Sequence, residues 1–344
     1  MTLWKKLITP SVFWFFVILA ITFIALYSHV KLYRNISQLI TLTYIGLDIV
    51  SSLKVLLTMG ICMTTGLREL RLYGKELKNA DALLVWKKSE NVKMLGGFLL
   101  GVNLVVVVAL LATIAQNSNG LREYLEVIFS LFLDCMTTLQ FVVLELELWV
   151  RFCSLNTRLL EVIPVRMTSA SLEGASQLPP LGRLRQLLEA YTALRHGAQH
   201  LQKHFGVPVA VSVAKSLCCS TCSAYEVLLI QLRPQWAEQL PLSPSVGNSL
   251  MFLTLRWLQL TIVALSCAAV EDAAATTGEI LLWASVVCKG RCSDLEAFLP
   301  VISHGPRLHF SAAGFFIVNR RLIVSALAIV ITYLVILGQL TPIQ

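Results

Sequence analysis

Three ionisable side chains lie inside long apolar stretches of the chain, where a charge needs a reason. Asp48, Asp134 and Arg256 each stand about eight or nine residues from the same end of their stretch, so parallel helices would bring them to one depth. Ionisable residues inside a membrane commonly mark functional sites. Two interpretations stay open: a buried ion pair that locks helices together, or the border of a ligand cavity.

Three histidines follow one another at helical spacing. His196, His200 and His204 are four residues apart and therefore share one helix face. Neighbouring pairs could chelate a metal, but the same face could equally be a polar surface in water. No further set of convergent catalytic groups occurs in the sequence, so we expect no enzyme, no metal and no cofactor.

The last apolar stretch carries few polar side chains, and some of them share a face. Thr332, Ile336 and Gln339 are spaced by four and three residues. In lipid, an amide such as that of Gln339 must face protein or water. The stripe could line a pore if several copies surround an axis, or Gln339 could form a single hydrogen bond to a neighbouring helix.

The composition indicates which kind of fold must position these residues. Of 344 residues, 14% are charged and 56% are hydrophobic, with a mean hydropathy of +0.72. A soluble domain carries roughly 25% charged residues. These values exclude a disordered chain, a coiled coil and a small disulfide scaffold, and they disfavour a soluble enzyme. The net charge of +8 is better explained by membrane topology than by nucleic acid, which we do not expect as a partner.

We therefore predict an all-α membrane protein, because a bilayer core needs about 20 apolar residues per helix. The whole chain, 1–344, is expected to form one seven-helix domain. The predicted crossings are 11–30, 39–65, 94–116, 124–150, 207–231, 248–270 and 322–340.

Most of the 28 Lys and Arg residues flank these stretches on the side of the N-terminus. The positive-inside rule then predicts a cytoplasmic N-terminus and, after seven crossings, an extracellular C-terminus. Asn35 begins a glycosylation sequon on the predicted outer side.

Two long cytoplasmic segments, 151–206 and 271–321, are expected to extend the helices inward. In the first, apolar residues recur at helical spacing and predict an amphipathic helix that runs into the next crossing. This stripe needs a partner, either within the chain or in other subunits. Its members are Leu184, Leu187, Tyr191, Leu194, Leu201 and Phe205.

The end of the chain resembles the signature of the insect gustatory receptors, within the insect chemoreceptor superfamily. Thr332-Tyr333, five mostly hydrophobic residues and then Gln339-Leu340 match the signature, except that Leu340 stands where Phe is usual. The upstream run from Phe310, Phe-Ser-Ala-Ala-Gly-Phe-Phe with Gly314, is also typical of that family.

The resemblance implies a ligand-gated, nonselective cation channel in the plasma membrane of sensory neurons. It implies a homo- or heterotetramer with related receptor subunits, surrounded by lipid, that detects a small-molecule tastant. By the same resemblance, the last helix lines the pore, and the tastant pocket lies in the outer parts of the second to sixth helices. The residues implied to line the pore are Thr332, Ile336, Gln339 and Leu340, and those expected at the pocket are Asp48, Asp134 and Arg256.

Three alternatives remain. The chain could be an odorant-receptor-type channel subunit, because related branches tolerate Leu at the position of Leu340. A seven-helix receptor that signals through a G protein would need an extracellular N-terminus, and the sequence lacks that class's motifs. A transporter should show repeated halves, and none is found.

Overall fold

We describe the protein from a computed structural model of the whole chain. The described residues are 67–84, 121–162, 181–232, 246–288 and 308–340, together with the single residues 60, 101, 105 and 108. The first three predicted crossings lie outside these residues, apart from the isolated positions. Asn35 and Asp48 lie outside them as well.

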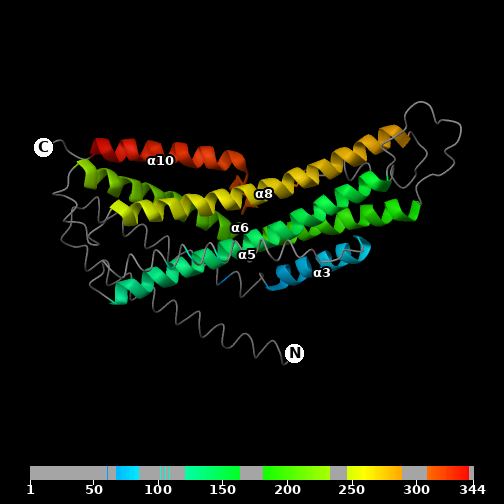
Figure 1. Ribbon diagram of the computed structural model, residues 1–344, viewed down its shortest axis with the longest axis horizontal. Coiled ribbons are helices and arrows are strands. Elements are labelled where there is room, and N and C mark those ends of the chain that lie inside the picture. Colours follow the sequence, from blue (N-terminus) through cyan, green and yellow to red (C-terminus); the bar gives the residue numbers. More distant parts are fainter. Residues whose placement is uncertain are drawn as a thin grey trace, which may run out of the picture.

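The described residues form five helices and one small hairpin. Three of the helices are far longer than a bilayer is thick, because 52 residues of helix span about 78 Å against a core of about 30 Å. Figure 1 shows these three helices running alongside one another over most of the molecule. The elements are α3 (Leu67–Leu84), α5 (Leu121–Val162), α6 (Leu181–Leu232), α8 (Val246–Cys288), β1 (Ser311–Ala312), β2 (Phe316–Ile317) and α10 (Arg320–Leu340).

Among the described helices, three are long and apolar enough to cross a membrane. They lie within α6, α8 and α10, over Gly182–Gln231, Ser249–Ser285 and Arg320–Gln339. Helix α5 covers the predicted crossing at 124–150. The protein therefore has an all-α membrane fold, as the composition predicted.

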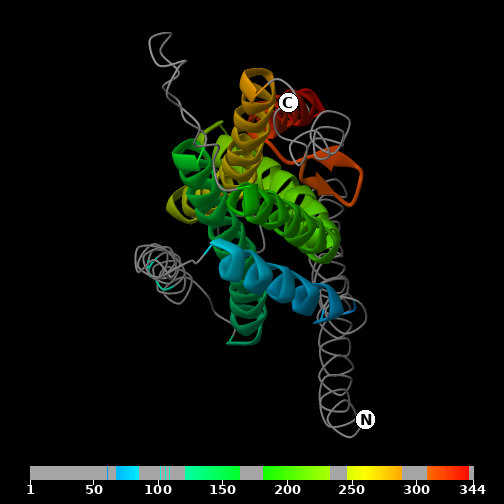
Figure 2. The ribbon, with the colours of Figure 1, turned by 90° about the vertical axis from the view of Figure 1, so that its right-hand side faces the viewer.

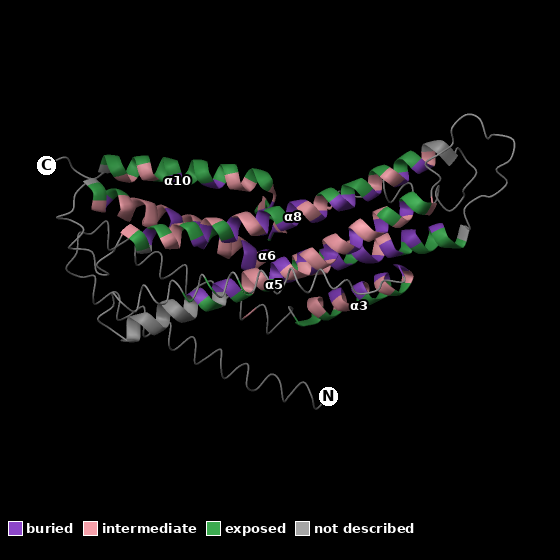
Figure 3. Ribbon diagram, viewed as in Figure 1, coloured by how far each residue is buried: buried purple, intermediate pink, exposed green. Residues whose placement is uncertain are grey.

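Helix α6 is the centre of the bundle, since it contacts α3, α5, α8, α10 and β1. Figures 1 and 2 place α3 and α10 on opposite sides of it. Figure 3 shows the buried residues concentrated where α3, α5, α6 and α8 run together.

The apolar stripe predicted on the N-terminal half of α6 is buried there. Leu194 and Leu201 are 0% exposed, and they pack with Leu148, Phe152 and Leu155 of α5. Tyr191 is half-buried at the edge of this core and meets Phe152 edge to face. The predicted stripe thus finds its partners within the same chain.

Polar contacts fix α3 to this core. The guanidinium of Arg151 on α5 binds both carboxylate oxygens of Asp81 on α3, at 2.7 and 3.1 Å, and donates to the carbonyl of Glu147 at 2.9 Å. Burial acts to lower the pKa of Arg151, but the hydrogen bonds and charge of Asp81 raise it above its usual value. The hydroxyl of Tyr73 donates to the carbonyl of Leu144 at 3.0 Å.

The histidine face of α6 is not simply a surface in water, because α3 covers part of it. His196 is exposed, but His200 lies 2.7 Å from a carboxylate oxygen of Glu69 on α3. His204 is buried and meets Phe205 edge to face, with ring centres 4.4 Å apart. Within the described ranges, no group of three or more His, Cys, Asp or Glu residues could hold a metal ion.

A hairpin precedes the last helix. Ser311 pairs with Ile317 and Ala312 with Phe316, and the NH of Val318 donates to the carbonyl of Phe310 at 2.8 Å. At the turn, Ala313 and Gly314 have φ values of 52° and 83°, the signs of a type I′ turn. Glycine adopts this conformation without a steric penalty, which explains the Gly in the sequence run that begins at Phe310.

Candidate functional site

A cluster of three charges joins α5, α6 and α8 in the membrane part of the bundle. One carboxylate oxygen of Asp134 lies 2.7 Å from the ammonium of Lys215 and 2.8 Å from the guanidinium of Arg256. All three side chains are buried. Because the attraction between charges is stronger in a medium of low dielectric constant, these contacts hold three helices in one arrangement.

Counting along the sequence anticipated part of this cluster. Asp134 and Arg256, which we expected at one depth, lie together. Lys215, which also binds Asp134, was not among the charges that we expected at this depth. The expectation that Asp134 and Arg256 border a ligand pocket, and the whole expectation for Asp48, stay predictions.

Gln259 of α8 extends the cluster toward the interior of the bundle. Its oxygen accepts a hydrogen bond from Arg256 at 3.1 Å, and its amide nitrogen donates to the sulfur of Cys135 at 3.2 Å. The oxygen and the nitrogen of the Gln259 amide are therefore both bonded, and the amide is held in a fixed orientation. The same side chain lines a pocket, so the charge cluster and the pocket are adjacent.

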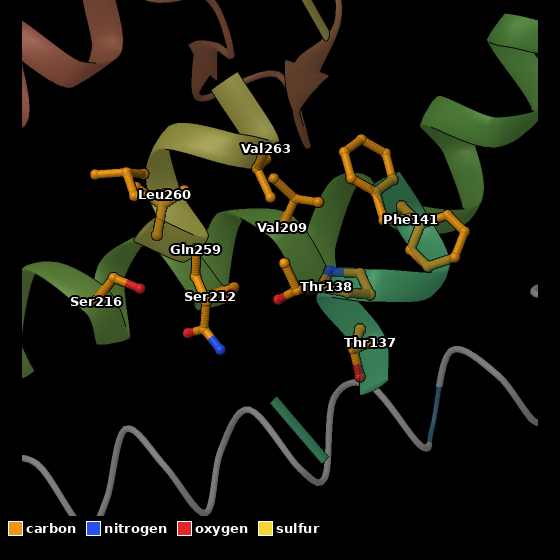
Figure 4. Close-up of a pocket in the computed structure, with 12 residues that line it drawn as sticks. Thr137, Thr138, Phe141, Val209, Ser212, Ser216, Gln259, Leu260 and Val263 are labelled. Atoms are coloured by element: carbon orange, nitrogen blue, oxygen red, sulfur yellow. The ribbon is translucent and has the colours of Figure 1, made fainter. Parts of the chain in front are cut away.

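The pocket lies between α5, α6 and α8 (Figure 4), and its enclosed volume is about 20 Å³, room for about one water molecule. A small organic ligand would therefore have to move these helices apart to be enclosed there. The polar lining consists of hydroxyls and one amide, and the rest is apolar. The lining residues are Thr137, Thr138, Phe141, Phe205, Pro208, Val209, Ser212, Val213, Ser216, Gln259, Leu260 and Val263.

None of the described lining residues carries a formal charge, although charges lie next to them. Asp134, Lys215 and Arg256 bind one another beyond Gln259, and none of the three is among the described lining residues. An ion entering the pocket would lose its hydration without meeting an opposite charge there. The pocket is therefore suited to an uncharged molecule with an apolar body and one or two hydrogen-bonding groups.

Helix α10 touches the rest of the described chain along one narrow face. Its buried residues are Ala326 and Val330, which are four residues apart, whereas Val324 and Tyr333 are 70% and 56% exposed. Hairpin and helix together form the segment that the sequence indicated as a lead-in followed by a crossing. Most of the surface of α10 is left for lipid or for other subunits.

The polar stripe of α10 lies on its exposed side. Thr332, Ile336 and Gln339 are all exposed, and the hydroxyl of Thr332 donates only to the carbonyl of Ala328 in its own helix, at 2.8 Å. Within the part of the chain that the structure describes, Gln339 makes no hydrogen bond to another helix. Leu340 ends the helix. A role of these residues at a pore remains a prediction.

Long helices able to cross a membrane, with a terminal helix largely exposed, define a polytopic membrane protein. The family model described as "7tm Chemosensory receptor" matches residues 3–341, and the chain belongs to this family. It is thus a multi-pass chemosensory receptor, in agreement with the resemblance found in the terminal motif.

Solved structures with the same fold agree with this assignment. The chain is similar to the insect olfactory receptor OR5 from Machilis hrabei, with 14% identity and a TM-score of 0.60 over 94% of this chain and 88% of that one. The same receptor in complex with eugenol matches with 12% identity and a TM-score of 0.56 over the same shares. No curated protein sequence matches the chain.

Proposed function

We propose that the protein is a gustatory receptor subunit that acts as a ligand-gated, nonselective cation channel. Four subunits, identical or related, would surround a central pore in the plasma membrane of a sensory neuron. The N-terminus would be cytoplasmic and the C-terminus extracellular. A small-molecule tastant would open the pore.

The observation that carries this proposal is the one-sided exposure of α10. The helix presents Thr332, Ile336 and Gln339 away from its own bundle. An amide exposed on a membrane helix must meet water or another protein chain. A ring of four such helices would satisfy this requirement by placing the amides around a water-filled path.

The pocket between α5, α6 and α8 is the place that we propose for the ligand. Phe205, Pro208 and Val209 put it toward the predicted cytoplasmic end of crossing 207–231, inward of the outer position that the resemblance implies. Its hydroxyls and its fixed amide could orient a small neutral molecule, and its apolar walls would bury the remainder. Eugenol, found with the Machilis hrabei receptor, has this chemistry, so a panel of phenols and uncharged alcohols is a sensible first set of tastants.

Ion selectivity provides the test of the proposal. Gln339→Glu should add a ring of negative charge at the pore and raise the permeability of divalent over monovalent cations several-fold. Leu327→Ala serves as the matched control, because Leu327 is exposed on the same helix but about 120° round from Gln339. Unchanged selectivity in a correctly assembled Gln339→Glu channel would contradict the proposal.

An odorant-type channel is the second candidate, and Leu340 is the residue that favours it. Both candidates are ligand-gated cation channels, and they differ in the kind of ligand that opens them. Responses to volatile odorants, together with silence toward water-borne tastants, would select the odorant type.

A further inference from the structure

We infer that the hairpin from Phe310 to Val318, pressed against Gly206 of α6, couples the pocket to α10. Gly206 is the residue that permits this coupling, because even a methyl group at this position would crowd the backbone of the hairpin. The inference rests on the proposed channel function, because the movement of α10 would open the pore. The coupling between the pocket and the hairpin can be measured separately from any current.

The contact is a close approach between two backbones. A Cβ atom placed on Gly206 would lie 3.1 Å from the amide nitrogen of Ala313, 3.5 Å from its Cα and 3.6 Å from the carbonyl oxygen of Ser311. These are backbone atoms of the hairpin turn and cannot rotate away as a side chain could. Any side chain at Gly206 would therefore displace the hairpin itself.

Polar bonds hold the hairpin to α6 and α8 around this contact. With its oxygen turned toward Ser311, the amide of Gln202 accepts from the NH and hydroxyl of Ser311 at 3.1 and 2.6 Å and donates to the carbonyl of His309 at 3.2 Å. A carboxylate oxygen of Glu271 on α8 accepts from the NH of Phe310 at 2.7 Å. The hairpin is thus fixed at its first strand to both helices.

On α6, the hairpin contact and the pocket share one turn of helix. Phe205 and Val209 line the pocket, and Gly206 lies between them in sequence. Pro208, which also lines the pocket, has no NH to donate to the carbonyl of His204, so the helix lacks a backbone hydrogen bond at this turn. Such a site is a usual cause of bending in a helix. A change in the pocket would therefore shift the residues on which the hairpin rests.

The hairpin continues directly into α10. The side chain of Asn319 accepts from the NH of Arg321 at 3.0 Å, and its carbonyl accepts from the NH of Leu322 at 3.0 Å. Arg320, the first residue of the helix, binds Asp272 of α8 at 2.8 Å. Because α10 is otherwise held by a narrow face only, a displacement of the hairpin would move the start of that helix.

The test uses the full-length chain and a matched pair of glycine variants. Gly206→Ala adds a methyl group at the contact. Gly197→Ala adds the same group to the same helix, where its nearest neighbours would lie at an ordinary 3.8 Å. The first readout is the ligand-free cation current per surface channel. Gly206→Ala should change this current at least about fivefold, whereas Gly197→Ala should stay within about twofold.

The second readout is hydrogen exchange of the purified protein, which needs neither a ligand nor a current. Filling the pocket by Val209→Phe should change exchange in residues 310–318 at least about threefold, and Gly206→Ala should do the same in residues 208–216. If the variants change hydrogen exchange as expected but the protein carries no cation current, the coupling is supported and the proposed channel function is contradicted. The coupling would be overturned if Gly206→Ala and Gly197→Ala channels carried equal currents and Val209→Phe left exchange at 310–318 unchanged. The channel function would be unaffected by this result.

Discussion

The carboxylate of Asp134 on α5 and the guanidinium of Arg256 on α8 lie 2.8 Å apart, and both side chains are buried. Lys215 of α6 binds the same carboxylate oxygen at 2.7 Å. A single acidic residue therefore holds two cationic residues from two other helices. Such an arrangement is costly to disturb, since removing one partner of a buried pair leaves the other charge uncompensated.

We predict that Asp134→Ala destabilises the receptor by about 3–5 kcal/mol, the usual cost of breaking a buried ion pair. The measurement is thermal or denaturant unfolding of the purified protein. Glu189→Ala is the control, because the pair of Glu189 with Arg185 is exposed and should contribute about 0.3–0.5 kcal/mol. Equal losses from both variants would show that the cluster does not brace the bundle.

Filling the pocket should weaken the response to ligand and spare folding. Val263 lines the pocket, so Val263→Phe should shift the dose–response curve for an active phenol or alcohol by at least about tenfold, corresponding to about 1.4 kcal/mol. Leu265→Phe is the control, since Leu265 lies on the same helix and is 46% exposed. A curve unmoved by Val263→Phe would place the ligand elsewhere.

Arg151 should matter for the part of the bundle in which α3 packs against α5 and α6. Arg151→Ala removes two hydrogen bonds to Asp81 and should cost about 2 kcal/mol of unfolding free energy, discounted because Asp81 is partly exposed. It should also increase proteolysis of α3. Lys75→Ala, on the exposed face of α3, should have no measurable effect on either quantity. Normal stability of the Arg151 variant would mean that apolar packing alone holds α3.

Glu145 is expected to be a residue that costs stability. It is fully buried on α5, and among the described residues neither of its carboxylate oxygens finds a hydrogen-bond partner. Burying a polar group without a partner is unfavourable. Glu145→Leu should therefore leave the unfolding temperature unchanged or raise it. A fall in this temperature by several degrees would show that the carboxyl makes an essential contact in the assembled receptor.

The sequence predicted those features that depend on one helix at a time. The run from Leu184 to Phe205 has the period of a helix with one apolar face, and this face is buried as expected. Asp134 and Arg256 are also about equally many residues from the outer ends of their predicted crossings, which predicted that they lie at the same depth. Both inferences use only the regular rise and rotation of a helix.

Features that depend on how one helix slides along another were not predictable in this way. The count placed Lys215 nearer to the cytoplasm than Asp134, but the axial offset of α6 along α5 brings the two side chains together. Likewise, His200 lies away from the main apolar stripe, yet α3 packs there and supplies Glu69. The apolar pattern of one helix predicts its main buried face, but it does not predict a second, polar face against which another helix packs.

The hairpin before α10 was missed for a different reason. Its strands, β1 and β2, have two residues each, too few for an alternating pattern to be recognised. The signal that was present is the turn pair Ala313-Gly314, which takes positive φ values at both positions. The close approach at Gly206 is visible only once two distant segments have been placed together.

The central claim is that α10 lines a water-filled path for cations, and cysteine accessibility tests it most directly. Currents through Gln339→Cys channels should be blocked by a charged, membrane-impermeant thiol reagent. Currents through Leu327→Cys and unsubstituted channels, which retain the native cysteines, should persist. Block of Leu327→Cys with no effect on Gln339→Cys would contradict the account, because it would place in the pore a face of the helix about 120° away from Gln339.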